Sequence, residues 1–201
     1  MLGVYQHIPN LFEDHKPKLK YKAGDINKSV IKMWKSAQKG WKPPTFVSEN
    51  DFNRLKQSTA DSAIKGYVGH QYSYGGQYFE GYAPKYGKSQ DSSVASKRVC
   101  NIAKNLKSVI FNPGIYTQFS NLKGYVIYCD PPYSNTYYKH KVDFDHDHFW
   151  NWCRKMSKDN IVFVSSYTAP KDFEEIFSTS HKLTGVIAGN KKRVEKLFLL
   201  F

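Results

Sequence analysis

The sequence predicts an α/β fold in which a mostly parallel sheet ends in a C-terminal antiparallel hairpin. Short apolar, β-favouring runs alternate with segments of helical periodicity, which is the pattern of strand–helix–strand units. The last two apolar runs are separated by only a short basic turn, and so short a connection requires antiparallel strands. The chain has 201 residues, of which 40% are hydrophobic, enough to bury one core.

In the first half of the chain, "KLKYKAGD" (18–25) predicts a short strand that ends at an acid. "INKSVIKMWKSAQKG" (26–40) predicts a helix, because its apolar residues recur at helical spacing and a glycine lies just past the end. A second helix is expected within residues 45–64. Residues 66–93 are rich in Tyr and Gly with poor periodicity, and "YGGQY" reads as a hairpin turn. We expect this stretch to be a recognition loop, or else a surface loop with incidental aromatic residues.

The second half alternates strands and helices more regularly. Asp145 is the expected N-cap of a helix at 144–158. We expect helices at 94–106, 144–158 and 169–177, and strands at 107–111, 125–129, 160–167, 182–188 and 194–201.

The composition favours a polyanionic partner. Thirty Lys and Arg against 17 Asp and Glu give a net charge of +13, for which nucleic acid is the first candidate and an acidic membrane surface the second. No apolar run is long enough to span a bilayer, and we see no signal-peptide pattern. The three cysteines include no C-x-x-C pair, which fits a reducing compartment without a zinc site. We therefore expect a soluble protein in the cytoplasm of a bacterium or a virus-infected cell.

The segment "YVIYCDPPY" places an acid, two prolines and a tyrosine directly after a predicted buried strand. In open α/β sheets, ligands bind beyond the carboxyl ends of strands. There, the Asp130 carboxylate and an adjacent backbone carbonyl can accept both N–H groups of a nucleobase amine and expose its lone pair. Pro131 and Pro132 fix the local backbone, and the Tyr133 ring can stack on a base extruded from the duplex. Asp25 follows another strand and should face the same crevice.

Two other constellations give weaker signals. "DHDHF" (145–149) holds two His and two Asp, but residues 146 and 148 do not face each other on a helix, so we expect no metal site. "SSY" (165–167) lacks the G-x-S-x-G elbow that a nucleophilic serine of the hydrolase type requires.

"YCDPPY" resembles motif IV of the Dam-type adenine-N6 DNA methyltransferases, most closely of phage-encoded members. The resemblance spans residues 18–201: "AGDINKSVIKMWKSAQKGWKPP" is similar to the acidic strand and following helix of the family, and "GNKKRVEKLFLLF" to its closing loop and strand. It implies a Rossmann-like class I methyltransferase sheet and S-adenosyl-L-methionine as cofactor. The implied activity is methyl transfer to adenine N6 in double-stranded DNA, without a membrane partner.

The resemblance also implies roles for individual residues. Asp130, Pro131, Pro132 and Tyr133 would be catalytic. Asp25 would bind the ribose and Ile26 the adenine of the cofactor, with Tyr116 and Asp130 also at the cofactor. "YSYGGQYFEGY" lies where the family has its target-recognition segment, and the basic segments would contact phosphates. The expected DNA-binding residues are Tyr72, Tyr74, Gln77, Tyr78, Lys139, Lys141, Lys191, Lys192 and Arg193. The implied division is an N-terminal part of the core (1–65), a target-recognition insert (66–93) and a catalytic core (94–201).

The sequence departs from the family at the cofactor site. The F-x-G-x-G strand and turn that precede the acid at Asp25 in the family are absent, so the sheet is expected to be shortened at its N-terminus. In "NPGIY", Gly114 and Ile115 stand where an acid is expected, and Asn112 is the candidate substitute. The chain is then a truncated or split form, relies on a partner chain or self-association for the missing strand, or binds cofactor poorly. The alternative function is a catalytically impaired DNA-binding subunit. A weaker alternative keeps the chemistry on RNA or on cytosine N4.

Overall fold

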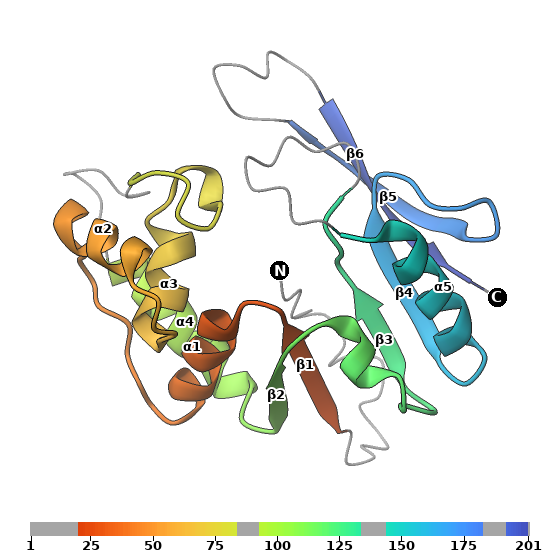
Figure 1. The fold of residues 1–201 in the computed structure, drawn as a ribbon, viewed down its shortest axis with the longest axis horizontal. Helices are drawn as coiled ribbons and strands as arrows, with labels where there is room; N and C mark the ends of the chain where they lie inside the picture. Colours follow the sequence, from red (N-terminus) through yellow and green to blue (C-terminus); the bar gives the residue numbers. More distant parts are fainter. Residues whose placement is uncertain (1–19, 84–92, 134–143, 183–191, 201) are drawn as a thin grey trace. The chain divides into compact units, whose positions relative to one another are not determined.

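The computed structural model describes residues 20–83, 93–133, 144–182 and 192–200 (Figure 1). These residues form two compact units, one ending at Tyr116 and the other beginning at Thr117. The three-part division predicted above concerns roles along the chain and remains a prediction.

The first unit contains a parallel pair of strands, β1 (Tyr21–Asp25) and β2 (Val109–Pro113). Their register pairs Tyr21 with Val109 and Asp25 with Pro113, so both strands end at the same edge. The Gly114 N–H extends the pairing by donating to the Asp25 carbonyl at 2.9 Å. Both strands were predicted, with boundaries shifted by two or three residues.

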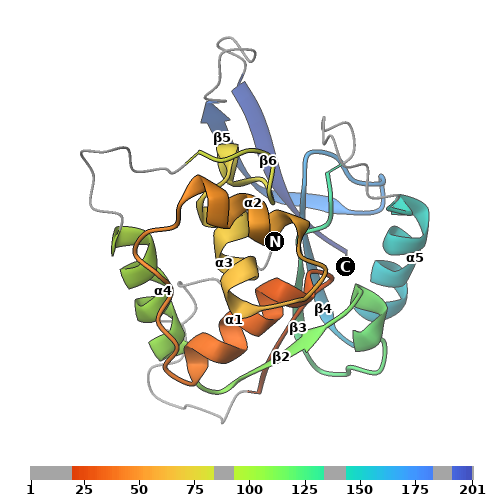
Figure 2. The same ribbon diagram turned by 60° about the vertical axis from the view of Figure 1, so that its left-hand side comes forward.

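Among the described residues between β1 and β2 there are four α-helices, which Figure 2 shows from a second direction: α1 (Lys28–Gln38), α2 (Glu49–Gln57), α3 (Ala63–Gln71) and α4 (Ser93–Asn105). The Asn27 side chain caps α1 by accepting from the N–H groups of Ser29 and Val30. Gly40 follows the helix with φ of 93°, a conformation that glycine adopts without strain. The predictions of α1, α2 and α4 are confirmed.

Helix α3 corrects the expectation that a loop begins at residue 66. Its two internal glycines, which suggested a loop, allow close packing instead. A Cβ on Gly66 would lie 2.2 Å from the backbone oxygen of Ser29 in α1, and one on Gly69 would lie 2.3 Å from the Tyr78 ring. Pairing of α1 with α3 therefore outweighs the low helix propensity of glycine.

The core of the first unit combines aromatic and aliphatic side chains. The Phe52 ring lies 5.0 Å from the Phe79 ring, and Tyr67 and Phe52 are almost completely buried. The cluster consists of Met33, Ala37, Val47, Phe52, Tyr67, Val68, Tyr72, Phe79, Ala95, Val99 and Ala103. Tyr67, Tyr72 and Phe79 lie in the stretch 66–93 that was predicted to be a recognition loop, and they stabilise this unit by burial.

The second unit contains a four-stranded sheet of order β3-β4-β6-β5. Strands β3 (Val126–Cys129) and β4 (Ile161–Ser166) are parallel, while β6 (Lys192–Leu199) is antiparallel to both β4 and β5 (Glu174–Lys182). The sheet is therefore mixed, with the predicted antiparallel hairpin at its C-terminal end. Strand β3 is less buried than predicted, since Val126 is 62% exposed.

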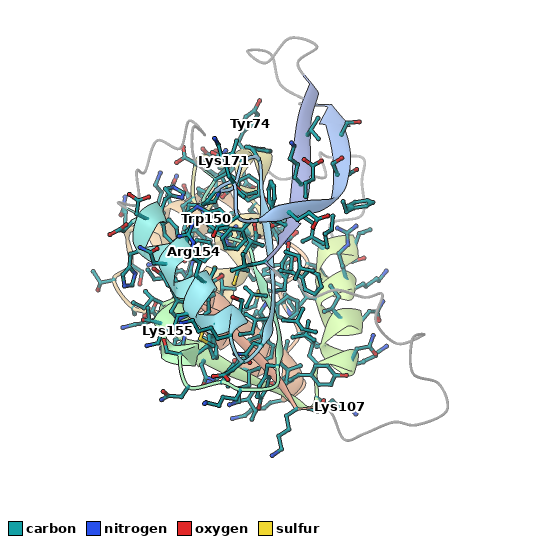
Figure 3. The ribbon with its side chains drawn as sticks, turned by 90° about the vertical axis from the view of Figure 1, so that its right-hand side faces the viewer. Tyr74, Lys107, Trp150, Arg154, Lys155 and Lys171 are labelled. Atoms are coloured by element: carbon teal, nitrogen blue, oxygen red, sulfur yellow. The ribbon has the colours of Figure 1, made fainter. Side chains whose placement is uncertain are left out.

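Helix α5 (His146–Ser157) begins where predicted, with the Asp145 side chain accepting from the His148 N–H at 2.8 Å. Its residues Trp150 and Arg154 are labelled in Figure 3. Arg154 binds Asp172 through two nitrogens at 2.6 and 2.9 Å, and the Trp150 ring packs 4.7 Å from Phe173. These contacts fix the helix to the segment that follows β4.

The helix predicted at 169–177 is wrong, because residues 169–173 form a non-helical connection with a turn and β5 begins at Glu174. The run "EEIF" has helical propensity, but pairing with β6 determines its conformation. Glu175 pairs with Phe198 in the ladder, and its carboxylate binds Lys196 at 2.6 Å. The first strand of the hairpin consequently begins eight residues earlier than predicted, and the rest of the predicted strand 182–188 lies outside the described residues.

Among the described residues, no helix has the length and apolar character that a membrane span requires.

Candidate active site

The segment Asp130 to Tyr133 directly follows β3, at the carboxyl end of a parallel strand as predicted. Strand β4 runs beside it in parallel, with Cys129 paired to Val164. The next residues along the two strands, Asp130 and Ser165, are therefore neighbours. The Ser165 hydroxyl donates to Oδ1 of Asp130 at 3.3 Å.

The two faces of this sheet have different characters. Side chains alternate along a strand, so Tyr128 and Ser165 share one face, and Cys129, Val162 and Val164 share the other. Val162 and Val164 are fully buried. The Cys129 thiol forms a hydrogen bond with the Cys153 thiol of α5, and this bond together with burial raises the pKa of Cys153. Helix α5 therefore covers the apolar face, and the polar site lies on the opposite one.

The Tyr133 side chain is held by several contacts within the second unit. Its hydroxyl donates to Oε1 of Glu195 on β6 at 2.7 Å and lies 3.2 Å from Oγ of Ser165. Its ring meets the Tyr167 ring edge-on, with 4.6 Å between centroids. The Tyr128 hydroxyl also donates to Ser165, at 2.9 Å. The structure thus brings two carboxylates and three hydroxyls together at the end of β3.

Burial shifts the titration of both predicted catalytic side chains. It raises the pKa of the Asp130 carboxyl above its ordinary 3.8, while hydrogen bonds from Tyr133 and Ser165 act in the opposite direction. Burial also raises the pKa of the Tyr133 hydroxyl well above its ordinary 10.0, and the bond to Glu195 contributes in the same direction. Tyr133 is therefore a neutral phenol at physiological pH, and Asp130 is a more basic carboxylate than usual.

This arrangement can bind a planar ring that carries an amino group. The carboxylate can accept one N–H and a neighbouring backbone carbonyl the other. Pro131 and Pro132 restrict the backbone between Asp130 and Tyr133, and the half-buried Tyr133 supplies an aromatic face. Both features are restrained in the structure, because the prolines limit the backbone and the Tyr133 hydroxyl is hydrogen-bonded to Glu195.

Three of the four predicted cofactor residues, Asp25, Ile26 and Tyr116, lie in the first unit near the end of its parallel strand pair, and the fourth, Asp130, belongs to the second unit. Asp25 ends β1, and its Oδ1 accepts from the Asn27 N–H at 2.7 Å. Ile26 follows with 63% of its surface exposed, and Tyr116 lies three residues beyond β2. A carboxylate beside an exposed apolar side chain fits the ribose and adenine of a nucleoside. The F-x-G-x-G segment that would approach the remainder of the predicted cofactor is absent from the sequence.

The four predicted recognition residues at 72–78 differ in their exposure. Tyr72 is 5% exposed and its hydroxyl donates to the Thr45 carbonyl at 3.1 Å, so it belongs to the core rather than to a DNA surface. Tyr78 is half-buried, with its ring 5.0 Å from His70. Tyr74, labelled in Figure 3, is 62% exposed, and Gln77 is exposed as well. Exposure therefore leaves Tyr74 and Gln77 as the best placed of the four.

The turn predicted at "YGGQY" is largely confirmed. Residues Tyr74–Gly76 form the short helix η2, in which both glycines have positive φ. An isolated antiparallel bridge joins Ser73 to Tyr82, and the Tyr74 N–H donates to the Gly81 carbonyl at 3.0 Å. The two ends of the turn are therefore joined by hydrogen bonds, and Tyr74 lies on the turn.

The predicted basic contacts lie mostly outside the described residues. This applies to Lys139, Lys141 and Lys191, while Lys192 and Arg193 begin β6 without described side chains. Their assignment to DNA remains a prediction. No group of three or more His, Cys, Asp or Glu suited to a metal ion occurs within the described ranges.

Four residues of this site were not predicted: Tyr128, Ser165, Tyr167 and Glu195. A signal existed for Ser165, because it ends the strand next to the one that ends at Asp130, and such ends share an edge. The sequence pattern around this serine was interpreted only for a role as a nucleophile. Glu195 carried no such signal, since its position depends on the order and register of β6 in the sheet.

Comparisons with known proteins give little similarity. No family model matches the chain, and no curated protein matches it either. Among solved structures, a match is "Putative methyltransferase yhhF from Escherichia coli", with 15% sequence identity and a TM-score of 0.28. The match covers 53% of this chain and 58% of that one, so the chain spans less than two thirds of the length of this neighbour.

Proposed function

We propose that the chain is a methyltransferase that moves a methyl group from S-adenosyl-L-methionine to the N6 amine of adenine in double-stranded DNA. The single observation that carries this proposal is the pairing of a half-buried, basic carboxylate, Asp130, with the restrained ring of Tyr133 at the end of β3. The resemblance of "YCDPPY" to the Dam-type motif names the reaction, and the net charge of +13 suits the substrate.

In the proposed reaction, the chain holds an extruded adenine and activates its amine. The Tyr133 ring stacks on the base, while Asp130 and the Pro131 carbonyl accept the two N–H bonds and direct the nitrogen lone pair outward. Asp25 and Ile26 would hold the nucleoside of S-adenosyl-L-methionine, which would supply the electrophilic methyl group and take the electrons of its carbon–sulfur bond on transfer. Asp130 accepts the proton that leaves the nitrogen and passes it to solvent. Its raised pKa makes it a better acceptor than an ordinary aspartate.

Each unit contains one parallel strand pair that fits a part of a doubly wound fold. In the order 3-2-1-4-5, removal of the first strand leaves one parallel pair, 3-2, and another, 4-5. The pairs β2-β1 and β3-β4 are each parallel and occur in this sequence order. We therefore propose that β1 and β3 correspond to the second and fourth strands of a class I methyltransferase sheet.

The test is a transfer assay with product identification. The purified chain is incubated with labelled S-adenosyl-L-methionine and unmethylated DNA, and the nucleosides are separated by mass spectrometry. We expect labelled N6-methyladenine, and none from the Asp130→Ala variant, whose DNA affinity should be preserved. Labelled N4-methylcytosine would show that cytosine is the substrate, and product formed only with RNA would show that RNA is; either result would contradict the proposed substrate. Loss of DNA affinity in step with activity would contradict the role of Asp130.

The missing glycine segment favours a second candidate, a DNA-binding subunit that obtains its cofactor site from a partner chain or a second copy. Calorimetric titration with S-adenosyl-L-methionine separates the two candidates. Cofactor binding by the isolated chain at micromolar concentration favours the enzyme. Retained DNA binding without cofactor binding favours the subunit, and light scattering would then show whether the chain self-associates.

A further inference from the structure

Ser165 and Glu195 have no role in the proposed reaction, yet both contact its central side chains. Ser165 is 3% exposed and bonds to Asp130, while Glu195 is half-buried and bonds to Tyr133. They reach the site from different strands, β4 and β6. Burying two such polar groups is costly unless they are hydrogen-bonded, so their contacts here are structurally meaningful.

Sheet geometry explains how the two residues reach one site. Ser165 pairs with Leu197 across the β4–β6 ladder, and cross-strand partners point to the same face. Glu195 lies two residues from Leu197, so it also faces that side. Tyr128 faces the same side because it pairs with Phe163, two residues before Ser165. The register of three strands therefore converges on this network, on the face opposite α5.

The contacts within the network share a limited number of protons. Tyr128, Ser165 and Tyr133 have one hydroxyl proton each, but at least four contacts connect them with one another and with the two carboxylates, besides the interaction of Tyr133 with Asp130. The contact from Tyr133 to Glu195 is the shortest, at 2.7 Å, and uses the Tyr133 proton. The Ser165 proton is then shared between Asp130 at 3.3 Å and Tyr133 at 3.2 Å. Glu195 thus holds the phenol, and Ser165 links the phenol to the carboxylate.

We propose that Ser165 and Glu195 are positioning residues that hold the Asp130 carboxylate and the Tyr133 ring as one preorganised unit for binding a base amine. The inference rests on the proposed function for its catalytic meaning. Ser165 orients the carboxylate by donating to its Oδ1, and Glu195 fixes the ring orientation by accepting from its hydroxyl. Misplacing a reacting group by about 1 Å costs on the order of 100-fold in rate, so loss of either contact should lower activity.

The first test is a double-mutant cycle on the transfer rate. We expect Glu195→Ala to lower kcat by about 10- to 100-fold, and Glu195→Gln, which keeps an acceptor oxygen, to recover most of it. In a Tyr133→Phe background, which has no hydroxyl to hold, Glu195→Ala should cause no further loss. The matched control is Glu174→Ala, an exposed glutamate on the neighbouring strand β5. Additive losses from Glu195→Ala and Tyr133→Phe would overturn the role of Glu195.

The second test does not depend on activity. In protein labelled with ¹³Cγ-aspartate, NMR titration follows the Asp130 carboxyl directly. Ser165→Ala removes a hydrogen bond that lowers the Asp130 pKa, so that pKa should rise; Glu195→Gln removes a nearby negative charge, so it should fall. Ser166→Ala is the matched control, because Ser166 is equally buried but alternates to the other face.

The two tests separate the two proposals. Absence of methyl transfer by the wild-type chain would refute the proposed function, while the NMR titration would still decide whether the network exists. An Asp130 pKa that does not move in Ser165→Ala, or moves equally in Ser166→Ala, would overturn the network whatever the activity. Movement of the pKa in both predicted directions, together with the non-additive cycle, would establish both positioning residues.

Discussion

Replacing Gly66 by alanine tests whether helix α3 is held by close contact with α1. In an open helix, this change stabilises by about 1 kcal/mol, since alanine has the higher helix propensity. Here the new Cβ would lie 2.2 Å from the backbone oxygen of Ser29, whereas real Cβ contacts are essentially never shorter than 3.0 Å. The two helices must therefore separate by roughly 0.8 Å, the difference between these distances.

Overpacking of this kind costs about 1–3 kcal/mol, and a backbone atom relaxes less readily than a side chain, so we take the upper end. After the gain in helix propensity, the net loss in the free energy of unfolding is about 2 kcal/mol. For a chain of 201 residues, this corresponds to a decrease in Tm of about 4–8 °C. The separation would also disturb the Ser29 hydroxyl, which donates to Asp61 at 2.8 Å near the start of α1.

Thermal unfolding followed by circular dichroism measures this effect. The matched control is Gly69→Ala on the same helix, where the nearest atoms belong to the Tyr78 side chain, which can rotate. We expect a smaller decrease in Tm for Gly69→Ala than for Gly66→Ala. An increase in Tm for Gly66→Ala would refute the reasoning, because it would show that propensity alone matters and that α1 and α3 are not in backbone contact.

Four further predictions concern residues of the proposed site and of the Tyr- and Gly-rich stretch. Burial raises the pKa of Asp130, so between the unfolded pKa and this raised pKa the folded state binds more protons than the unfolded state. The free energy of unfolding therefore decreases as the pH rises through this range, and the loss is complete above the raised pKa. Asp130→Asn should therefore abolish methyl transfer yet raise Tm at pH 7, an advantage that disappears in strong acid; an unchanged Tm difference between pH 3 and pH 7 would contradict this linkage. Tyr74→Ala should weaken DNA binding by about 1–3 kcal/mol in a fluorescence anisotropy titration, since the ring is exposed. By contrast, Tyr72→Phe should leave DNA affinity unchanged and cost about 1 kcal/mol of stability through its lost bond to Thr45. Asp25→Asn should weaken S-adenosyl-L-methionine binding in calorimetry while DNA affinity stays constant; a parallel loss of both would argue against a cofactor role.

Local sequence patterns predicted the elements whose signals lie within a few residues. Asp145 was identified as a helix N-cap because capping requires only the next turn of the chain, and the structure confirms it. The strand ending at Asp25 was identified from an alternating pattern that ends in an acid, and the strand before Asp130 from a short apolar run; both are present. Their boundaries differ by only one to three residues.

The errors occur where partners distant in sequence decide the conformation. Gly66 indicates a loop by itself, but α1 supplies a backbone surface that only glycine can approach. The run containing Glu174 and Glu175 has helical propensity, but β6 pairs with it as a strand. Tyr72 looked like a recognition residue in a Tyr- and Gly-rich stretch, and the surrounding helices bury it.

The sequence by itself therefore determined the chemical centre of the candidate site: an acid, two rigid residues and an aromatic ring at the end of a strand. Those four residues are contiguous, so covalent geometry keeps them together wherever the strand lies. Only the tertiary structure decided what surrounds them, because Ser165 and Glu195 reach Asp130 and Tyr133 through the register of β4 and β6. A one-residue shift in either strand would turn these side chains to the opposite face, and that register depends on packing across the whole sheet.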